Sequence, residues 1–282
     1  LGVAFFSGIR SAEPDMRLSA DLLYDGTNFM DIRVLGTLGV TEDDLNAIRE
    51  IPGVNDTEGL ISLEALANDG EQELVVQVST LPQKIGLPIL SDGRMPETTS
   101  ECLLDVTLSG SYPLGSTISL YGDQTSADEE DTGEDTGTST SADTELSLEN
   151  TLTGTEFTVV GYFSSATYLS WDRGTASIGD GSLDGLLMLI PEAFSSDYYT
   201  EIYVTVEGAK GLTSMTQEYE DTVAGITDQI EAIADARCQI RYDSIVDEAN
   251  QELADGRQEL EDAREEADQE LADARQQLVD AE

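Results

Sequence analysis

The chain has 282 residues, of which 58 are Asp or Glu, 13 are Lys or Arg and none is His, so its formal net charge is −45. Without histidine there can be no Ser-His-Asp or Cys-His catalytic centre, and two cysteines cannot supply an all-thiolate zinc site. Such a charge repels phosphate backbones, which argues against a nucleic-acid partner, while a hydrophobic content of 39% is enough for a core.

The first residues are apolar and uncharged up to Arg10. Nine such residues are too few to cross a bilayer, which needs about 20. We expect residues 1–13 to be the end of a transmembrane helix and a linker, with a first buried strand as the alternative. At the other end the helical pattern still runs at Glu282, and we expect the natural chain to continue.

The next segment predicts strand, helix, strand and strand. Residues 31–36 alternate in polarity and are rich in β-branched side chains, as strands are. Thr41, followed by three acids, predicts a helix N-cap with a capping box, and Pro52-Gly53 predicts the end of that helix. The two further strands are expected at residues 54–66 and 74–78.

The middle of the chain predicts a β-rich region interrupted by an acidic loop. Strands are expected at residues 101–108, 117–121, 157–162, 186–190 and 203–206. Residues 122–150 carry ten acids and no base, with too few apolar side chains to offset ordering, so they predict a disordered loop at the tip of a hairpin. A calcium loop is the alternative, but the acids lack the EF-hand order.

A helix is predicted after the last strand, with Ser214 as its N-cap. Apolar residues recur at steps of 4, 3, 4 and 3, which predicts a stripe that packs on a sheet. The stripe consists of Tyr219, Val223, Ile226, Ile230 and Ile233.

The C-terminal segment predicts a long amphipathic helix, reaching roughly 70 Å over residues 237–282. Its small and apolar residues form a seam with an 18-residue repeat, because residues 252–260 recur at 270–278. A repeat made of seven plus eleven residues predicts a nearly straight coiled coil. The expected i,i+4 ion pairs Arg257–Glu261 and Arg264–Asp268 have the poorer orientation and add little to helix stability. The partner is a returning helix, a second subunit or another protein, and a solvated single helix is the alternative. The leucines of the proposed partner-contact seam are Leu253, Leu260, Leu271 and Leu278.

Candidate chemistry is sparse. We predict no catalytic residue, no cofactor site and no metal site, since no phosphate loop or nucleophile motif occurs. The neighbouring acids Glu97, Glu101 and Asp105 are interpreted as solvated surface groups. Cys102 and Cys238 could form a disulfide outside the cytoplasm, closing a long loop.

The order of segments resembles the large extracytoplasmic domain of MacB/FtsX-type ABC transporter permeases, in particular the Gram-positive type with a coiled-coil insertion. The resemblance rests on order and spacing over nearly the whole chain. Its motifs are the apolar start, Asn28-Phe-Met-Asp-Ile-Arg-Val-Leu-Gly36, Leu38 to Leu45, Ile51-Pro-Gly-Val54, Gly93-Arg-Met-Pro96, Glu101 to Asp105, Leu114 to Ile118, Phe157 to Tyr162 and the acidic coil.

The resemblance implies an α+β fold in which a β-rich subdomain is inserted into a porter-like α+β subdomain, followed by a coiled-coil arm. The porter-like part would be residues 14–80 and 196–236, the insert residues 81–195, and the truncated arm residues 237–282. The arm is expected to be the outgoing half of an antiparallel hairpin. The acidic loop departs from the usual family pattern.

The implied role is mechanical and not enzymatic. Such permeases do not hydrolyse ATP themselves; a separate cytoplasmic ATP-binding subunit does, and with a second permease half or subunit the domain transmits the resulting motion to an extracellular substrate or protein. The expected location is the extracytoplasmic side of the cell membrane. The rival readings are a secreted coiled-coil structural or adhesin-like protein and an acidic extracellular hydrolase.

Overall fold

The computed structural model describes residues 2–122, 148–168 and 173–280. The chain divides into two compact units, residues 1–232 and 233–282, which are described separately. In this described part, no helix combines the length and the apolar character needed to cross a bilayer. Most of the predicted acidic loop lies outside the described residues. Its last residues are helical rather than disordered, because α3 begins at Leu148, whose side chain is buried.

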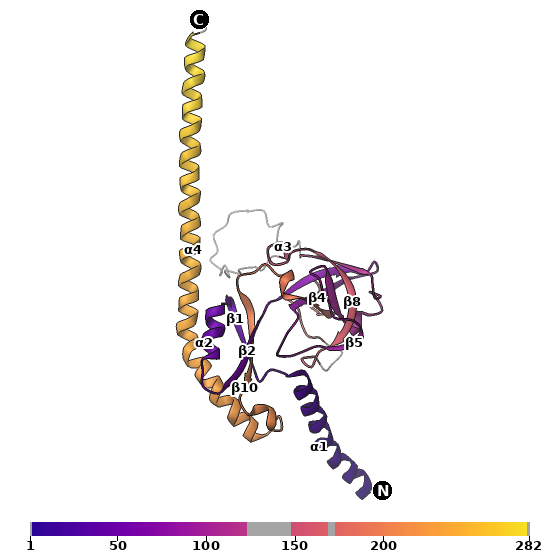
Figure 1. The fold of residues 1–282 in the computed structure, drawn as a ribbon. Coiled ribbons are helices and arrows are strands. Elements are labelled where there is room, and N and C mark those ends of the chain that lie inside the picture. Colours follow the sequence, from indigo (N-terminus) through magenta and orange to yellow (C-terminus); the bar gives the residue numbers. More distant parts are fainter. Residues whose placement is uncertain (1, 123–147, 169–172, 281–282) are drawn as a thin grey trace, which may run out of the picture. The chain divides into compact units, whose positions relative to one another are not determined.

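The structure is a mixed α+β fold that ends in a long helix (Figure 1). The helices are α1 (Gly2–Thr27), α2 (Glu42–Arg49), α3 (Leu148–Thr151) and α4 (Gln217–Asp280). The strands are β1 (Ile32–Val40), β2 (Val54–Leu60), β3 (Ser62–Asn68), β4 (Glu73–Thr80), β5 (Ile89–Gly93), β6 (Glu101–Asp105), β7 (Thr117–Tyr121), β8 (Glu156–Ser164), β9 (Gly185–Leu189) and β10 (Tyr199–Val206).

A small antiparallel sheet has the order β1-β10-β2, so the last strand lies between the first two. Helix α2 packs on this sheet, and its predicted capping box is confirmed: Thr41 Oγ1 accepts from Asp44 N, and Asp44 accepts from Thr41 N. Leu45 and Ile48 of α2 are buried. The predicted apolar stripe at the start of α4 is also confirmed, since all its members are at least partly buried.

Gly53 allows α4 to approach the turn between α2 and β2. Its φ is +97°, and a Cβ there would lie 2.7 Å from Cδ1 of Ile226. The predicted cap of α4 is wrong by two residues. Thr216 Oγ1 accepts from Tyr219 N at 3.4 Å, whereas the Ser214 hydroxyl donates to Asp21. Ser214 is therefore used for a tertiary contact instead of a helix cap.

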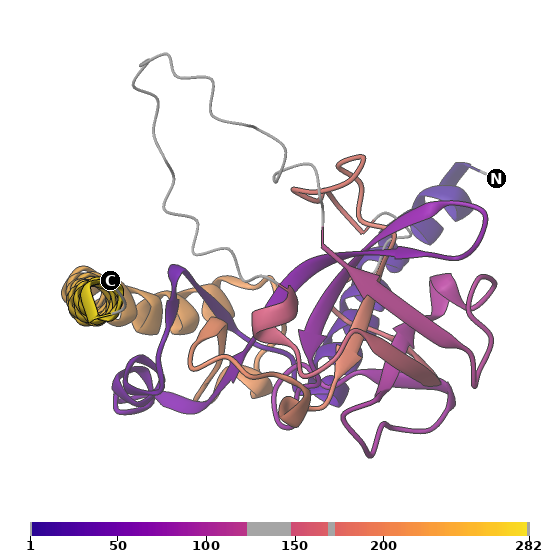
Figure 2. The same ribbon diagram turned by 90° about the horizontal axis from the view of Figure 1, so that it is seen from above.

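The larger sheet has the order β5-β8-β6-β9-β4-β3-β7, and β7 also pairs with β8. That additional pairing closes six strands into a small barrel and leaves β5 as an extra strand on β8 (Figure 2). The predicted pairing of residues 117–121 with the strand after the acidic loop is confirmed. Because closure removes free edges, strands as short as five residues are held on both sides.

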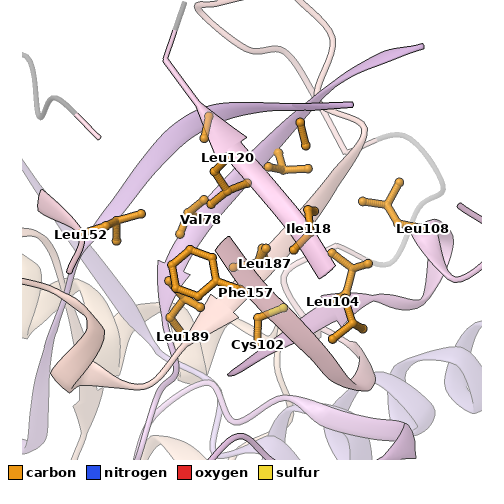
Figure 3. Close-up of a cluster of buried hydrophobic side chains, with 14 of the residues drawn as sticks. Val78, Cys102, Leu104, Leu108, Ile118, Leu120, Leu152, Phe157, Leu187 and Leu189 are labelled. Atoms are coloured by element: carbon orange, nitrogen blue, oxygen red, sulfur yellow. The ribbon is translucent and has the colours of Figure 1, made fainter. Parts of the chain in front are cut away.

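The barrel interior is a core of interleaved apolar side chains (Figure 3). Residues alternate inward along each strand, as in β4, where Val76 and Val78 point into the core and Val75 belongs to an outer cluster. β9 is buried along its whole length, as its continuous apolar run predicts. Phe157, Leu187 and Leu189 are among the largest fully buried side chains.

The hydrogen-bonded sheets group the strands of residues 14–236 differently from the predicted porter-like and inserted subdomains. β3 and β4 were assigned with the porter-like residues 14–80, but both are strands of the barrel. The small sheet thus takes β1 and β2 from the first 60 residues and β10 from residues 199–206. Residues 1–13, expected to end in a linker, continue without a break into α1 from Gly2 onward. The domain boundaries stay predictions.

Candidate functional site: the junction of α1 with the start of α4

The candidate site lies where α1 ends, beside two other segments of the first unit. We call it the junction and define it as residues 17–31, the loop 83–87 and residues 205–219. A cavity of about 430 Å³ lies between the first and the last of these segments. The parts of the junction are far apart in sequence, so their hydrogen bonds connect separate elements of the fold.

Helix α1 ends in a motif that fixes the direction of the chain. Asn28 adopts a left-handed backbone (φ 48°), and Phe29 N donates to Tyr24 O at 2.8 Å while Asn28 N donates to Asp25 O at 3.3 Å. These are the two bonds of a Schellman motif. The rings of Tyr24 and Phe29 stack with centroids 5.0 Å apart, which supplies the apolar contact of that motif.

One side of α1 is bonded to the segment that leads into α4. The carboxylate of Asp21 accepts from both the backbone N and the hydroxyl of Ser214, the former at 2.9 Å. Arg17 Nη1 donates to the carbonyl of Met215 at 3.2 Å. Met215 has a left-handed backbone (φ 62°), which is rare for a residue with a side chain. Three bonds with α1 therefore hold the turn that precedes α4.

Asp31, just before β1, joins β10 to the first turn of α4. Its Oδ2 accepts from Val206 N and its Oδ1 accepts from Tyr219 Oη, each at 2.7 Å. Burial and the hydrogen bond to Asp31 raise the pKa of Tyr219. Tyr219 therefore stays protonated and donates to this carboxylate at any physiological pH.

The loop 83–87 connects α1 and the small sheet to the barrel. Asn28 Nδ2 donates to Lys84 O at 2.8 Å, and Gly86 N donates to Asn28 O at 2.9 Å. From β2, the carboxylate of Glu58 accepts the backbone N–H groups of Gln83, Lys84 and Ile85 at 2.6, 3.0 and 2.7 Å. Charge-assisted bonds to three consecutive amides fix this loop in one conformation.

A second group of charged residues is buried on the barrel. Arg173 Nε donates to Asp105 Oδ2 at 2.7 Å and Nη2 to Oδ1 at 3.0 Å, with only 7% and 2% of the two side chains exposed. Asp105 was expected to be a solvated surface acid, and that expectation is wrong. The guanidinium compensates the buried carboxylate, which would otherwise be too costly to bury.

The buried glutamate Glu201 of β10 bears on the alternative that the chain is an acidic hydrolase. Burial raises the pKa of this carboxyl, and its ion pair with Arg33 opposes the rise. The cavity beside the pair is only about 30 Å³, room for a single water molecule. A carboxyl with a raised pKa is thus present, but its cavity is far too small for a sugar or peptide substrate.

Glu101 is held by Arg94 near the barrel. Both guanidinium Nη atoms donate to its carboxylate, and the backbone N of Glu97 donates to it at 2.8 Å. These bonds, the one from Arg94 foremost, lower the pKa of Glu101 to about 2. Glu101 is therefore an ion-paired carboxylate and not a proton donor. Among the residues that the structure describes, no three acid or thiol side chains are placed to hold a metal ion.

Within the second unit the described leucines of the predicted seam are exposed. Leu253, Leu260 and Leu271 are 57%, 62% and 55% exposed within the chain. Leu278 lies in the same helix, but its side chain is outside the described residues. The seam stays a predicted contact surface. Sequence reasoning missed the junction itself, for which Asn28, a residue type favoured at helix ends, was the one local signal.

Both cysteine thiols are free in the structure. Cys102 of β6 is fully buried in the barrel core, whereas Cys238 of α4 is exposed. Burial raises the pKa of Cys102 to about 12, so almost none of it is thiolate at neutral pH. A fully buried thiol is poorly placed to form a disulfide with an exposed one.

Thiol labelling checks this difference. At pH 8 we expect an alkylating reagent to modify Cys238 quickly and Cys102 only after unfolding, because the thiolate is the reacting species. Mass spectrometry should show one modified thiol in the native chain. After unfolding in about 6 M guanidinium both thiols should be modified, because unfolding exposes Cys102. Equal labelling of Cys102 in the native chain, or a Cys102–Cys238 disulfide, would contradict the structure.

The fold is an α+β domain of two sheets in which α1 is hydrogen-bonded to the turn that precedes α4. No family model and no curated protein matches this sequence. Among solved structures, the chain is similar to the extracellular domain of the noncanonic ABC-type transporter YknZ from Gram-positive bacteria. That match has 12% identity and a TM-score of 0.36, covering 67% of this chain and 84% of the other.

A second similar structure is the periplasmic region of MacB from Actinobacillus actinomycetemcomitans. Its identity is 11% and its TM-score 0.35, and the match covers 71% of this chain and 75% of that one. At TM-scores this low the superposition is loose, so the function is inferred from the residues of this chain.

Proposed function

We propose that this chain is the extracytoplasmic domain of the permease subunit of an ABC transporter, and that it transmits ATP-driven movement to an extracellular substrate or protein. The observation that carries the proposal is the junction, in which α1 is bonded to the turn before α4 and to the loop that enters the barrel. The ordered motifs that resemble MacB/FtsX-type permeases support the same class.

The junction suits a relay of movement because its bonds leave α1 little freedom of its own. Asp21 and Arg17 hold the turn before α4, while Asn28 holds the loop 83–87. Asp31 then connects β10 with the first turn of α4. A displacement of the end of α1 would therefore be passed both to α4 and to the barrel. Hydrogen-bond networks between rigid elements carry such coupling.

The partners follow from this role. The proposal requires a separate cytoplasmic ATP-binding subunit and a second permease half or subunit, and it places the chain on the outer side of the cell membrane. The exposed leucines of α4 are the proposed contact surface for a partner. No catalytic role is proposed for this chain.

The location is tested with the native thiol of Cys238, which is exposed. In intact cells that produce the whole natural protein, a membrane-impermeant maleimide should label Cys238, and a Cys238→Ser variant should remain unlabelled. The labelled protein should co-purify with an ATP-binding subunit in mild detergent. Labelling only after lysis would exclude the extracytoplasmic location, and purification without any ATPase would contradict the transporter assignment.

A further inference from the structure

In the second unit, the residues that flank the leucine seam of α4 are acidic on one side and basic on the other. The residues before Leu253, Leu260 and Leu271 are Glu252, Glu259 and Glu270, and we call these three residues the acidic flank. Three of the small seam residues, Gly256, Ala263 and Ala274, are followed by Arg257, Arg264 and Arg275, and we call these three arginines the basic flank; the small residues Ala249 and Ala267 are followed by Asn250 and Asp268. At an offset of 18 residues Glu252 recurs as Glu270 and Arg257 as Arg275, whereas Glu259 is replaced by the neutral Gln277.

The two flanks have the positions that set helix pairing in coiled coils. With the seam leucines at heptad position a and the small residues at d, the acidic flank occupies g and the basic flank e. In a parallel pair, each g residue faces the e residue five positions further along the partner, and these charges choose partner and orientation. Here the spacing of five holds three times, for Glu252 with Arg257, Glu259 with Arg264 and Glu270 with Arg275.

Two of the flank arginines, Arg257 and Arg264, lie among the side chains that the structure describes. In the described residues of the second unit, no ion pair involves Arg257 or Arg264, so the expected pairs with Glu261 and Asp268 are not formed. Nearby side-chain hydrogen bonds of this unit run from Gln251 to Asp255 and from Gln258 to Asp262, both at 2.9 Å. Leu253, Leu260, Leu271 and the two arginines are exposed within the described residues and accessible to a partner.

We infer that the second unit pairs in parallel and in register with a second copy of this chain, through the leucine seam and through ion pairs between the acidic flank of one copy and the basic flank of the other. An antiparallel pair of copies would place g against g and e against e, so acid would face acid and Arg would face Arg. The inference does not depend on the proposed transporter role, because it rests on the seam and the flanks of α4 alone.

A cysteine series on the 282-residue chain tests orientation and register. In a Cys238→Ser background, single variants Ala249→Cys, Ala263→Cys and Ala274→Cys are oxidised and run on a non-reducing gel. A parallel pair in register brings identical d positions to disulfide distance along the whole seam, so all three should give a covalent dimer. Gln258→Cys, on the outer face, is the control and should give little. Cys102 is buried and does not interfere.

Charge reversal tests the role of the flanks. Arg257→Glu with Arg264→Glu turns attraction into repulsion at the helix edges, and sedimentation equilibrium should show dimer dissociation at about 10-fold higher concentration. The control, Gln251→Glu with Gln258→Glu, adds negative charge on the outer face and should change the dissociation constant by no more than about twofold.

Two outcomes would overturn the inference. One is a monomeric chain with cross-linking no better than that of Gln258→Cys, which would mean that a different helix covers the seam. The other is efficient cross-linking at only one of the three positions, which is the result for an antiparallel pair. Either outcome would leave the labelling and co-purification test of the transporter role unaffected.

Discussion

Changing Asp105 to alanine is expected to lower the free energy of unfolding by about 3–5 kcal/mol, because it leaves the guanidinium of Arg173 buried without its carboxylate. The two side chains make two charge-assisted hydrogen bonds and are almost completely buried. Arg173 also donates to the carbonyl of Tyr168 at 3.2 Å, so the pair anchors a loop to the end of β6. Unfolding in urea can be followed by the fluorescence of Trp171, the single tryptophan.

Two further variants distinguish the effect of losing the buried ion pair from the effect of losing side-chain packing. The double variant Asp105→Leu with Arg173→Met replaces both charges by apolar groups, and it should be more stable than Asp105→Ala, since apolar replacement of a buried pair is often neutral. Arg94→Met breaks the ion pair with Glu101, in which 49% of the arginine side chain is exposed, and its effect should be much smaller. A loss below about 1 kcal/mol for Asp105→Ala would mean that the pair is not buried in solution.

Changing Asp31 to alanine is expected to have the second largest effect. It should lower the free energy of unfolding by about 2–4 kcal/mol and remove the connection between β10 and the first turn of α4. It leaves the N–H of Val206 and the hydroxyl of Tyr219 without their acceptor, and each unsatisfied donor costs about 1–3 kcal/mol. Tyr219→Phe removes only the hydroxyl and should cost about 1 kcal/mol. Asp31→Asn keeps one oxygen and the volume, so its loss should be intermediate.

A double-mutant cycle isolates the Asp31–Tyr219 bond. If the bond exists, Tyr219→Phe should cost less in the Asp31→Ala background than in the wild type, with a coupling energy of at least about 0.5 kcal/mol. Asp228→Ala removes an exposed carboxylate from α4 and serves as the control for a change in charge. Additive effects of the two substitutions would contradict the contact between β1, β10 and α4 at the junction.

Local patterns predicted many elements of this fold, because strands and helix caps are set largely by neighbouring residues. The single strand predicted at residues 54–66 is wrong, since the chain there forms β2 and β3, which belong to different sheets. Thr41 is a clear case, since its partner Asp44 is only three positions away. Residues 117–121 were predicted to be a strand with the observed bounds. Ser214 was misassigned because two hydroxyl residues stand near the start of α4, and Asp21, 193 positions away, decides which of them is free to cap it.

The junction and the barrel could not be read from the sequence for the same physical reason. Arg173 and Asp105 are 68 positions apart, and Glu58 binds amides 25 to 27 positions away. Nothing in the local composition distinguishes these carboxylates from the many solvated ones in so acidic a chain. Closure of the barrel likewise depends on which strands β8 pairs with, and alternation of polarity along a strand does not specify its neighbours.

The relay of movement through the junction is the central claim, and a distance between two spin labels tests it most directly. The labels are placed at Ser119→Cys on the barrel and Gln258→Cys on α4, in a Cys238→Ser background of the intact permease with its ATP-binding subunit. The distance should change between the nucleotide-free and the ATP-bound states, and Asp31→Ala should abolish that change. An unchanged distance in the wild type, or the same change in the Asp31→Ala variant, would contradict the relay.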